Sequence, residues 1–289
     1  MQNTLQYHYM VKKLREFFHD KKGFIEVPAQ SRTSILAACE QPETVTQYKL
    51  GNVIYPLPQT GQMWLEHELL KNPTWPGAYC ITTSYRDEPV IIEGRHLRIF
   101  PMFEFEMPGT ITELRNLERE LVTFLGFNEP VSVFYDDACD TYKSRTVEAS
   151  HELQLASQLG SVISLELFPR RTNPFWNMKR NEQGTYNKID VLLHGMETIG
   201  SAERSCDAVQ MREDFFTMVD GRYSQLLFDL FEKSRVLKEL DEFLSLPMFA
   251  RFGGGIGITR LARAMELEGL FDTMPYTYTN NYISRSVSL

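Results

Sequence analysis

The stretch from residue 253 to residue 260 most constrains how this chain can fold. It reads Gly-Gly-Gly-Ile-Gly-Ile-Thr-Arg, and it joins a strand predicted over residues 248–255 to a helix predicted over residues 258–268. Glycines at positions 253, 255 and 257 recur every second residue, so the strand can pass close to something flat or bulky. No Lys-Ser or Lys-Thr follows, which excludes a phosphate-binding P-loop. The stretch therefore predicts a strand, a glycine turn and a helix that presents Arg260 in its first turn, either toward a ligand or into solvent.

The other periodic segments predict a sheet flanked by helices. Apolar residues at helical spacing predict helices, and short apolar or alternating runs predict strands. The predicted helices cover residues 5–20, 62–70, 112–125, 210–227, 234–244 and 258–268, and the predicted strands cover residues 24–28, 77–83, 99–107, 189–193 and 248–255. Because strands dominate the middle of the chain without alternating with helices, we expect an antiparallel sheet in an α+β fold. Without a repeat or a linker, residues 1–289 are expected to form a single domain, with a less regular insertion around residues 129–187.

Composition and charge restrict the class of protein. Lys and Arg number 30 and Asp and Glu number 38, so the net charge is −8, which gives no support for a broad nucleic-acid-binding surface. The four cysteines, Cys39, Cys80, Cys139 and Cys206, form no CxxC pair and lie at no zinc spacing, so we expect free thiols. The N-terminus lacks an apolar signal core, and no apolar run approaches the roughly 18 residues of a membrane span. We therefore expect a soluble, cytoplasmic protein.

One candidate ligand site lies in a predicted strand–loop–strand hairpin. It contains Arg86 and Glu88 on the first strand, His96 after a loop and Phe100 on the second strand. An arginine can grip two phosphate oxygens at once, and a phenylalanine ring offers adenine a flat apolar surface. The pattern predicts a nucleotide site. An exposed cross-strand pair of Arg86 and Glu88, beside a Phe100 in the core, would have the same pattern.

A second candidate site contains Asp190, Glu197 and Arg204. The two acids bracket an apolar strand and a turn. Converging carboxylates can hold Mg²⁺ while waters and phosphates complete its octahedron, and Arg204 could then face a carboxylate or an amide of a substrate. A hairpin that carries acids on its surface is the alternative.

Together the three segments resemble class II aminoacyl-tRNA synthetases, in particular the aspartate, asparagine and lysine branch. Residues 85–88, with His96 and Phe100 after the loop, match motif 2 of that family, and residues 253–260 match every fixed position of its motif 3, Gly-x-Gly-x-Gly-x-x-Arg. Asp190, Glu197 and Arg204 match its Asp-x6-Glu-x6-Arg run at full spacing. The resemblance spans about residues 10–275 and implies a class II synthetase-like antiparallel sheet of six to seven strands flanked by helices. Pro28 resembles the motif 1 proline, which implies a homodimer through the region 23–33.

The resemblance implies how ATP is bound. Arg86 would bind the α-phosphate and the reacting carboxylate, Glu88 would read the adenine amino group, and Phe100 would stack on the ring. Arg260 would cover the other face of the ring and touch the γ-phosphate, and His96 would lie near that phosphate. Arg86 and Arg260 would thus be the catalytic pair in an in-line attack that forms an aminoacyl-adenylate and pyrophosphate.

The resemblance also implies how the metal and the amino acid are bound. Asp190 and Glu197 would hold Mg²⁺, and Gln62 would help to hold the amino acid. Arg204 matches the arginine that members specific for aspartate or asparagine direct at the side-chain carbonyl. Leu65 stands where aspartate-specific members carry a lysine, and Glu66 could accept a hydrogen bond from an amide. Glu203-Arg204, however, resembles archaeal-type asparagine synthetases, which use aspartate, so both amino acids stay open.

Two departures from the family bear on the function. Ile99 stands where the family has Glu or Gln, so one contact to adenine or to the amino group is expected to be missing or to come from elsewhere. The chain begins at motif 1, without room for the anticodon-binding domain of the family's tRNA ligases. We therefore expect transfer of the activated amino acid to a non-tRNA acceptor such as ammonia, an amine, a carrier or a protein. A stand-alone tRNA ligase domain and a non-catalytic paralogue are the alternatives.

Overall fold

A single large sheet forms the centre of the computed structural model, which describes residues 3–29, 33–37 and 42–272. Its strands in chain order are β1 (Ile25–Glu26), β4 (Ala78–Tyr85), β5 (Ile99–Pro108), β6 (Val131–Phe134), β7 (Val162–Phe168), β8 (Tyr186–Leu193), β9 (Met196–Glu203) and β10 (Arg251–Gly257). In space the order is β1-β4-β5-β10-β9-β8-β7-β6. Neighbouring strands run antiparallel except for the two edge pairs, β1–β4 and β6–β7, which are parallel. The expected α+β fold is confirmed, with eight strands instead of six or seven.

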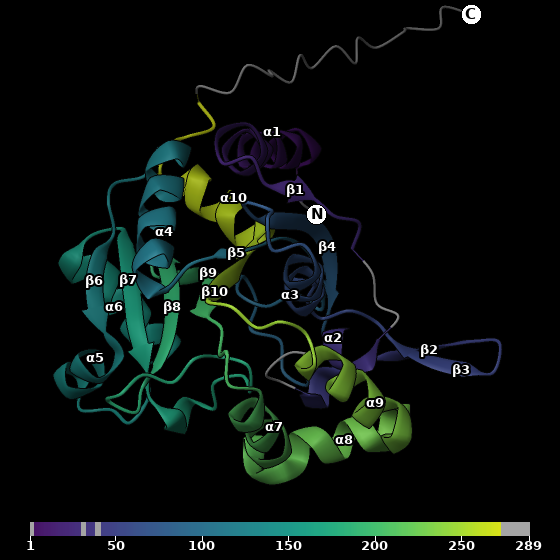
Figure 1. The fold of residues 1–289 in the computed structure, drawn as a ribbon. Helices are drawn as coiled ribbons and strands as arrows, with labels where there is room; N and C mark the ends of the chain where they lie inside the picture. The colour runs from purple at the N-terminus through teal and green to yellow at the C-terminus, as the bar shows by residue number, and fades with distance from the viewer. Residues whose placement is uncertain (1–2, 30–32, 38–41, 273–289) are drawn as a thin grey trace, which may run out of the picture.

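One face of the sheet is covered by three helices that are far apart in the chain. They are α1 (Thr4–Arg15), which continues as a π-helical segment (Glu16–Lys21), α4 (Ile111–Leu125) and α10 (Ile258–Leu267) (Figure 1). In α10 the buried residues Ile258, Leu261, Ala264 and Met265 follow the helical period and form one apolar stripe. They join a core that includes Phe103 and Ile256 of the sheet. This face is therefore filled by apolar side chains.

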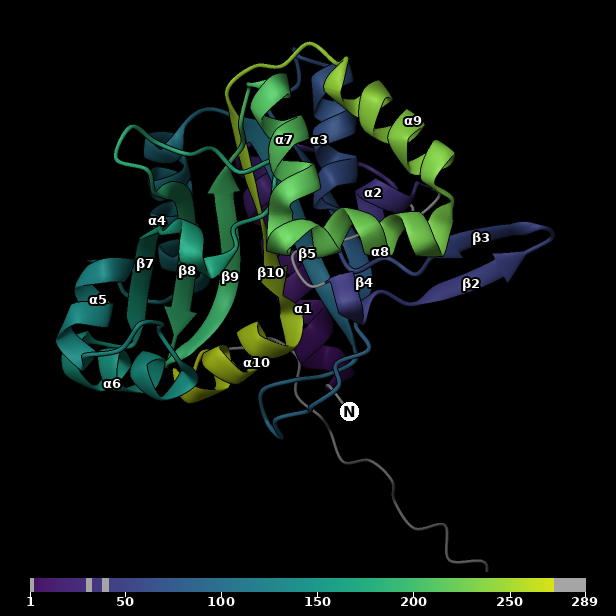
Figure 2. The ribbon, with the colours of Figure 1, turned by 90° about the horizontal axis from the view of Figure 1, so that it is seen from below.

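The opposite face is covered by other helices, which leave room for a cavity. These helices are α3 (Gln62–Lys71), α5 (Tyr135–Tyr142), α6 (Ala149–Leu159), α7 (Ala208–Thr217), α8 (Arg222–Phe231) and α9 (Lys233–Leu244) (Figure 2). Met63 of α3, Met211 of α7 and Phe243 of α9 share a second core with Ala202 of β9. None of the helices in the described part of the chain is long and apolar enough to cross a membrane. Cys80, Cys139 and Cys206 are free, as expected, and Cys39 lies outside the described residues.

Residues 129–187 are more regular than expected. They contain β6, α5, α6, β7 and a 3-10 turn (Arg170–Thr172), so this segment adds two strands to the sheet. Six of the seven residues of β7 are buried, including the polar Ser164 and Glu166, although these two residues alternate with apolar ones in the sequence. No strand was predicted over these residues, although alternation over residues 163–167 is typical of one.

Two further predicted boundaries were wrong. The helix predicted over residues 210–227 is divided between α7 and α8 by a 3-10 turn (Met218–Gly221), where Val219, Asp220 and Gly221 all have positive φ angles. The glycines of residues 253–257 lie within β10 instead of forming a turn after it. That strand is paired on both sides, with β5 and β9, so pairing holds the glycines in an extended conformation.

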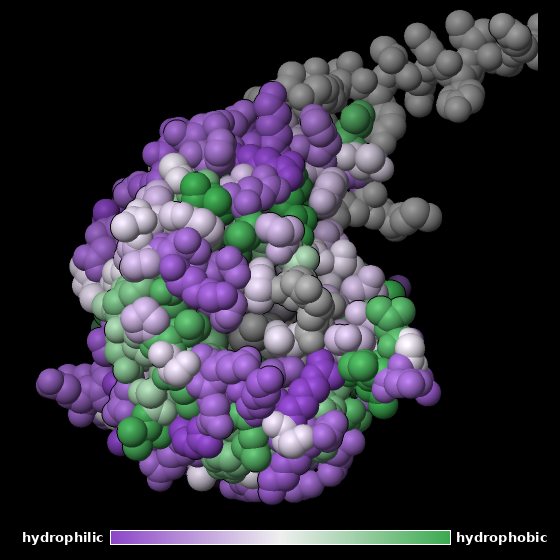
Figure 3. All heavy atoms as spheres, turned by 45° about the vertical axis from the view of Figure 1, so that its right-hand side comes forward, coloured by the Kyte–Doolittle hydropathy of each residue, from purple (hydrophilic) through white to green (hydrophobic). Residues whose placement is uncertain are grey.

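A small hairpin stands apart from the main sheet. It is formed by β2 (Gln47–Leu50) and β3 (Val53–Pro56) and projects from the body of the molecule next to the short helix α2 (Ser34–Ala37) and a 3-10 turn (Pro42–Thr44) (Figures 1 and 2). In the space-filling view, hydrophilic side chains are spread over much of the surface, with hydrophobic residues in patches between them (Figure 3).

Candidate active site

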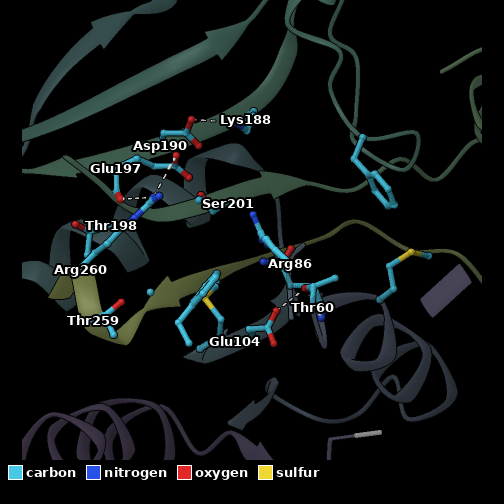
Figure 4. A pocket seen from close by; sticks show the side chains of 18 of the residues that line it. Thr60, Arg86, Glu104, Lys188, Asp190, Glu197, Thr198, Ser201, Thr259 and Arg260 are labelled. Carbon is cyan, nitrogen blue, oxygen red and sulfur yellow. Dashed lines mark hydrogen bonds and ion pairs between the residues drawn. The ribbon is translucent and has the colours of Figure 1, made fainter. Parts of the chain in front are cut away.

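All ten residues that the sequence analysis selected line one cavity of about 340 Å³. They come from α3, the β4–β5 loop, the β8–β9 hairpin and the start of α10, and they are Gln62, Glu66, Arg86, Glu88, His96, Phe100, Asp190, Glu197, Arg204 and Arg260. Lys188, Asp190, Glu197 and Arg260 gather at one side of the cavity, and Thr60, Arg86 and Glu104 at the other (Figure 4). The fold thus brings together segments that are far apart in the chain.

The β4–β5 hairpin places a cation beside an aromatic ring. The register pairs Ser84 with Phe100, and the Arg86 N–H donates to the carbonyl of Arg98 at 2.8 Å. The Arg86 guanidinium lies 5.6 Å from the centre of the Phe100 ring. Phe100 is only half-buried and lines the cavity, so it does not belong to the core.

Arg95, which was not predicted as a site residue, connects the β4–β5 loop to helix α6. Arg95 forms an ion pair with Glu152 of α6, and both side chains are mostly buried. Burial raises the pKa of the Glu152 carboxyl, and Arg95 lowers it. Since Arg95 lies next to His96, this contact holds the predicted ATP-binding part of the loop over the cavity.

Two carboxylates converge above a glycine in the β8–β9 hairpin. Asp190 pairs with Gly200 across the two strands. A Cβ atom on Gly200 would lie 3.1 Å from Oε1 of Glu197 and 3.5 Å from Oδ1 of Asp190. The missing side chain of Gly200 therefore leaves a space that both acids face.

Cations surround these carboxylates. Lys188 Nζ lies 2.9 Å from Oδ2 of Asp190, and Arg260 Nη1 lies 3.6 Å from Oε2 of Glu197 while donating to the Glu197 carbonyl at 2.8 Å. Burial raises the pKa of the Glu197 carboxyl, but the nearby cations, first Arg260 and then Lys188, outweigh burial and leave that pKa below its usual value. Glu197 is therefore ionised at neutral pH.

Mg²⁺ fits this pair of acids. In proteins that bind nucleotides it takes one or two carboxylates, while phosphates and waters complete its coordination. Within the described residues there is no group of three or more His, Cys, Asp or Glu that could hold a metal without such help. The donor set thus suits a metal that arrives with a triphosphate.

Four charged side chains are packed beneath the end of the cavity that Gln62 and Arg204 line. Arg204 donates to both oxygens of Glu106 at 3.2 Å and to Oε1 of Gln62 at 3.0 Å. Arg251 donates to Oε2 of Glu66 at 2.7 and 3.1 Å. Oε1 of Glu66 accepts from Asn177 at 2.5 Å. Because both Glu66 oxygens already accept hydrogen bonds from the protein, its expected contact with a substrate amide stays a prediction.

The sequence analysis missed the two acids of β5. Glu104 is fully buried and accepts from Thr60 and Thr82 at 2.5 Å and from the N–H of Gly61 at 2.8 Å, and burial raises its pKa. Glu106 is equally buried and lies opposite Gly253. The alternation of these acids with phenylalanines predicted a strand over residues 99–107 but gave no role to the acids. The glycines of residues 253–257 were the available signal that this side is covered by something large.

Comparison with known proteins places the chain in a family. The family described as tRNA synthetases class II (D, K and N) matches residues 1–268. The chain belongs to this family. The predicted resemblance is therefore confirmed, and members of the family are ligases that form an aminoacyl-adenylate. No curated protein matches the sequence.

Solved structures support the same fold. An asparaginyl-tRNA synthetase from Pyrococcus horikoshii, complexed with asparaginyl-adenylate, has a TM-score of 0.74 at 18% identity, covering 90% of this chain and 64% of that chain. An Entamoeba histolytica asparaginyl-tRNA synthetase with the same adenylate has a TM-score of 0.72 at 18% identity, over 91% of this chain and 63% of that one. An aspartyl-tRNA synthetase from Entamoeba histolytica has a TM-score of 0.67 at 16% identity, over 90% and 54%. This chain therefore spans less than two thirds of the length of these synthetases.

Proposed function

We propose that this protein catalyses the ATP-dependent adenylation of an asparagine- or aspartate-type amino acid. The observation that carries the proposal is the convergence of ten predicted residues, with both cations and carboxylates, on one cavity. Membership of a family of adenylate-forming ligases supports it. The protein would join the carboxylate of the amino acid to the α-phosphorus of ATP and release pyrophosphate.

Arg86 and Arg260 would bind and orient ATP. They lie on opposite sides of the cavity (Figure 4), so a bent triphosphate between them could contact both guanidiniums. Phe100 would stack on adenine, Glu88 would accept from its amino group, and His96 would lie near the γ-phosphate. Arginine suits this role because its planar fork binds two phosphate oxygens at a time.

The bond-forming step needs no nucleophile from the protein. A carboxylate oxygen of the amino acid attacks the α-phosphorus, the bond to the β-phosphate oxygen breaks, and pyrophosphate leaves with that electron pair. Arg86 would neutralise charge on the α-phosphate, while Gln62 and Arg204 would hold the amino acid in line. Positioning and charge neutralisation would supply most of the rate enhancement.

Asp190 and Glu197 would hold Mg²⁺ together with the phosphates. When bound, the metal would neutralise the charge on the phosphate oxygens and on the leaving pyrophosphate. Lys188 pairs with Asp190 and Arg260 pairs with Glu197, and these cations hold the pKa of the Glu197 carboxyl below its usual value.

For the acceptor we propose a molecule other than tRNA, such as ammonia, an amine, a carrier or a protein. The net charge of −8 supports this choice, because tRNA binding relies on cations that meet the phosphates. Transfer to tRNA is the second candidate, favoured by membership of a family of tRNA synthetases. Release of AMP from the preformed adenylate on adding ammonium, but not on adding total tRNA, would support the first candidate. The reverse pattern would support the second.

The test of adenylation is amino-acid-dependent ATP–pyrophosphate exchange with each of the twenty amino acids, without tRNA. We expect exchange with asparagine or aspartate and loss of exchange in an Asp190→Ala, Glu197→Ala double variant. Asp241→Asn, which changes an exposed acid that pairs with Arg212, serves as the control. Absence of exchange with every amino acid would contradict the proposal, and unchanged exchange in the double variant would contradict the metal site.

We also propose a homodimer through the region 23–33, of which residues 30–32 lie outside the described part. Ile25 is exposed there at the edge of the sheet, and Pro28 follows β1. A single species of twice the chain mass in light scattering at micromolar concentration would support the dimer, and a monomer would contradict it.

A further inference from the structure

Two buried arginines and two buried glutamates form a continuous cluster at the amino-acid end of the cavity. Glu66, Glu106 and Arg251 have no exposed surface, and Arg204 is 2% exposed. Arg251 donates to Glu66 at 2.7 Å, Arg204 Nε lies 3.5 Å from the other oxygen of Glu66, and Arg204 also donates to Glu106. We call these four residues the buried quartet.

Only part of the quartet reaches the cavity. Arg204 and Glu66 line it, and Arg204 contacts Gln62, another lining residue. The Arg251 guanidinium instead donates to Glu66 and to the carbonyls of Ser205 and Phe249, so it is satisfied within the protein. Arg251 is therefore a positioning residue that acts on a bound ligand through Glu66 and Arg204.

The formal charges of the quartet cancel when Glu106 is ionised. Both oxygens of Glu106 accept from Arg204, which is how an ionised carboxylate binds a guanidinium. Two guanidiniums then face two carboxylates. The nearby Glu203 pairs with Lys179 at 2.7 Å, and the charge of Arg86 lowers the pKa of Glu104 against the effect of burial. Arg204 thus lines the cavity, while the carboxylate of Glu106 already balances its positive charge.

We propose that Arg251, by matching Glu66, makes this end of the cavity electrically neutral and so selects an amide side chain, asparagine, over the carboxylate of aspartate. An unmatched charge in a buried site is strongly disfavoured. An aspartate carboxylate would add one negative charge that no cation of the quartet is left to balance. An asparagine amide adds none, and its carbonyl can still accept from Arg204.

This inference rests on the proposed adenylation and concerns which amino acid that site takes. Its test compares kcat/KM for asparagine and aspartate in ATP–pyrophosphate exchange in wild type and charge variants. The assay is run at pH 8.5, because burial raises the pKa of the Glu106 carboxyl to about 8, so the carboxylate form then predominates. The ratio of the two kcat/KM values is the readout.

Variants that alter the net charge are expected to move this ratio. Wild type should prefer asparagine. Glu66→Gln leaves one excess positive charge, so it should lower the asparagine-to-aspartate ratio by about tenfold or more at an effective dielectric constant of about 20. Arg251→Met leaves one excess negative charge, so it should reject aspartate at least as strongly as wild type, even if activity with asparagine also falls.

Variants that keep the net charge are expected to preserve the ratio. The double variant Glu66→Gln, Arg251→Met removes one charge of each sign, and Arg251→Lys retains the cation. Both should return the ratio to within about threefold of wild type, since a factor of three is well below the effect of one unit charge. Arg235→Met breaks an arginine–glutamate pair between Arg235 and Glu239 on α9, away from the cavity, and should leave the ratio unchanged.

Several outcomes would overturn the inference. If Glu66→Gln lowers both activities equally, the quartet is structural and does not select the substrate. A wild type that prefers aspartate, or a changed ratio in the double variant or in Arg251→Lys, would also overturn it, even if the two single variants fail to fold. Absence of exchange with either amino acid in wild type would instead refute the proposed adenylation.

Discussion

Glu106 on β5 reaches Arg204, which follows β9, across the intervening strand β10. Gly253 of β10 lies opposite Glu106 on one side and opposite Ala202 on the other. A Cβ atom on Gly253 would lie 1.7 Å from Oε2 of Glu106 and 2.4 Å from the backbone carbonyl of Phe105. The ion pair can therefore form only because position 253 has no side chain. The first glycine of the motif therefore allows Glu106 to hold Arg204 at the wall of the cavity.

Replacement of Gly253 by alanine should destabilise the protein. The added methyl group collides with a backbone atom and displaces Glu106 from Arg204, so we expect a loss of about 3–5 kcal/mol in the free energy of unfolding. Urea denaturation would measure it. Gly257→Ala is the matched control, because a Cβ there would meet nothing closer than Arg260 at 3.7 Å, and its cost should stay below about 1 kcal/mol. Equal effects of the two variants would contradict this account.

Gly200→Ala should weaken the metal site. The new methyl group would lie 3.1 Å from Oε1 of Glu197 and 3.5 Å from Oδ1 of Asp190, inside the space that both acids face. We expect the Mg²⁺ concentration for half-maximal exchange to rise by roughly tenfold, as for other changes that disturb the arrangement of metal ligands. The KM for the amino acid in the same variant serves as the internal control. An unchanged Mg²⁺ requirement would show that the metal lies elsewhere.

Arg260→Lys should impair the use of ATP. The arginine is held by the carbonyl of Glu197 at 2.8 Å and would bind the triphosphate with its fork, which a lysine cannot reproduce. We expect the KM for ATP to rise by about tenfold or more. Arg263→Lys is the matched control, since Arg263 lies on the same helix and contacts the carbonyl of His194 at 3.4 Å. If both variants change the KM equally, the effect belongs to the helix and not to Arg260.

We expect the buried carboxyl of Glu118 to lower the free energy of unfolding as the pH rises. It lies on α4, fully within the protein, where it accepts from Ser201 at 2.6 Å, and burial raises its pKa well above the usual 4.5. Above pH 4.5 the unfolded chain releases this proton while the folded state keeps it. Rising pH therefore favours unfolding, by up to about 1.4 kcal/mol per pH unit, until the folded-state pKa is passed.

Glu118→Gln removes this titration and retains an acceptor for Ser201. We expect the variant to gain stability relative to wild type as pH increases from 5 to 8, measured by thermal unfolding. Glu120→Gln, on the exposed side of the same helix, should show no such trend. A constant difference between Glu118→Gln and wild type across this range would contradict the prediction.

Local patterns determined much of the fold and the identity of the site residues. The helix predicted over residues 62–70 is α3 (Gln62–Lys71), and that predicted over residues 112–125 is α4 (Ile111–Leu125), because their apolar residues keep the helical period. The three motifs named eight of the ten residues that line one cavity, and the family resemblance added Gln62 and Glu66. Spacing within each motif was sufficient for this, since each motif lies on one hairpin or one strand–helix junction.

Features that depend on distant partners were not accessible from local patterns. In β7 the polar residue Glu166 is buried and pairs with Arg115 of α4, and the break between α7 and α8 depends on left-handed residues at 219–221. Lys188 and Arg95 contribute cations to the cavity from positions that no motif marked.

The sequence by itself determined which chemical groups are present and in what order: an arginine, a ring and an acid for a nucleotide, two acids for a metal, and glycines at period two. Only the tertiary structure decided how their charges are paired. Glu66 meets Arg251 from 185 residues away, and Glu106 meets Arg204 from 98 residues away. A buried acid and an exposed acid are written with the same letter in a sequence. Whether a buried carboxylate has a cation beside it depends on which residue the fold brings within a few ångströms, in a place that water does not reach.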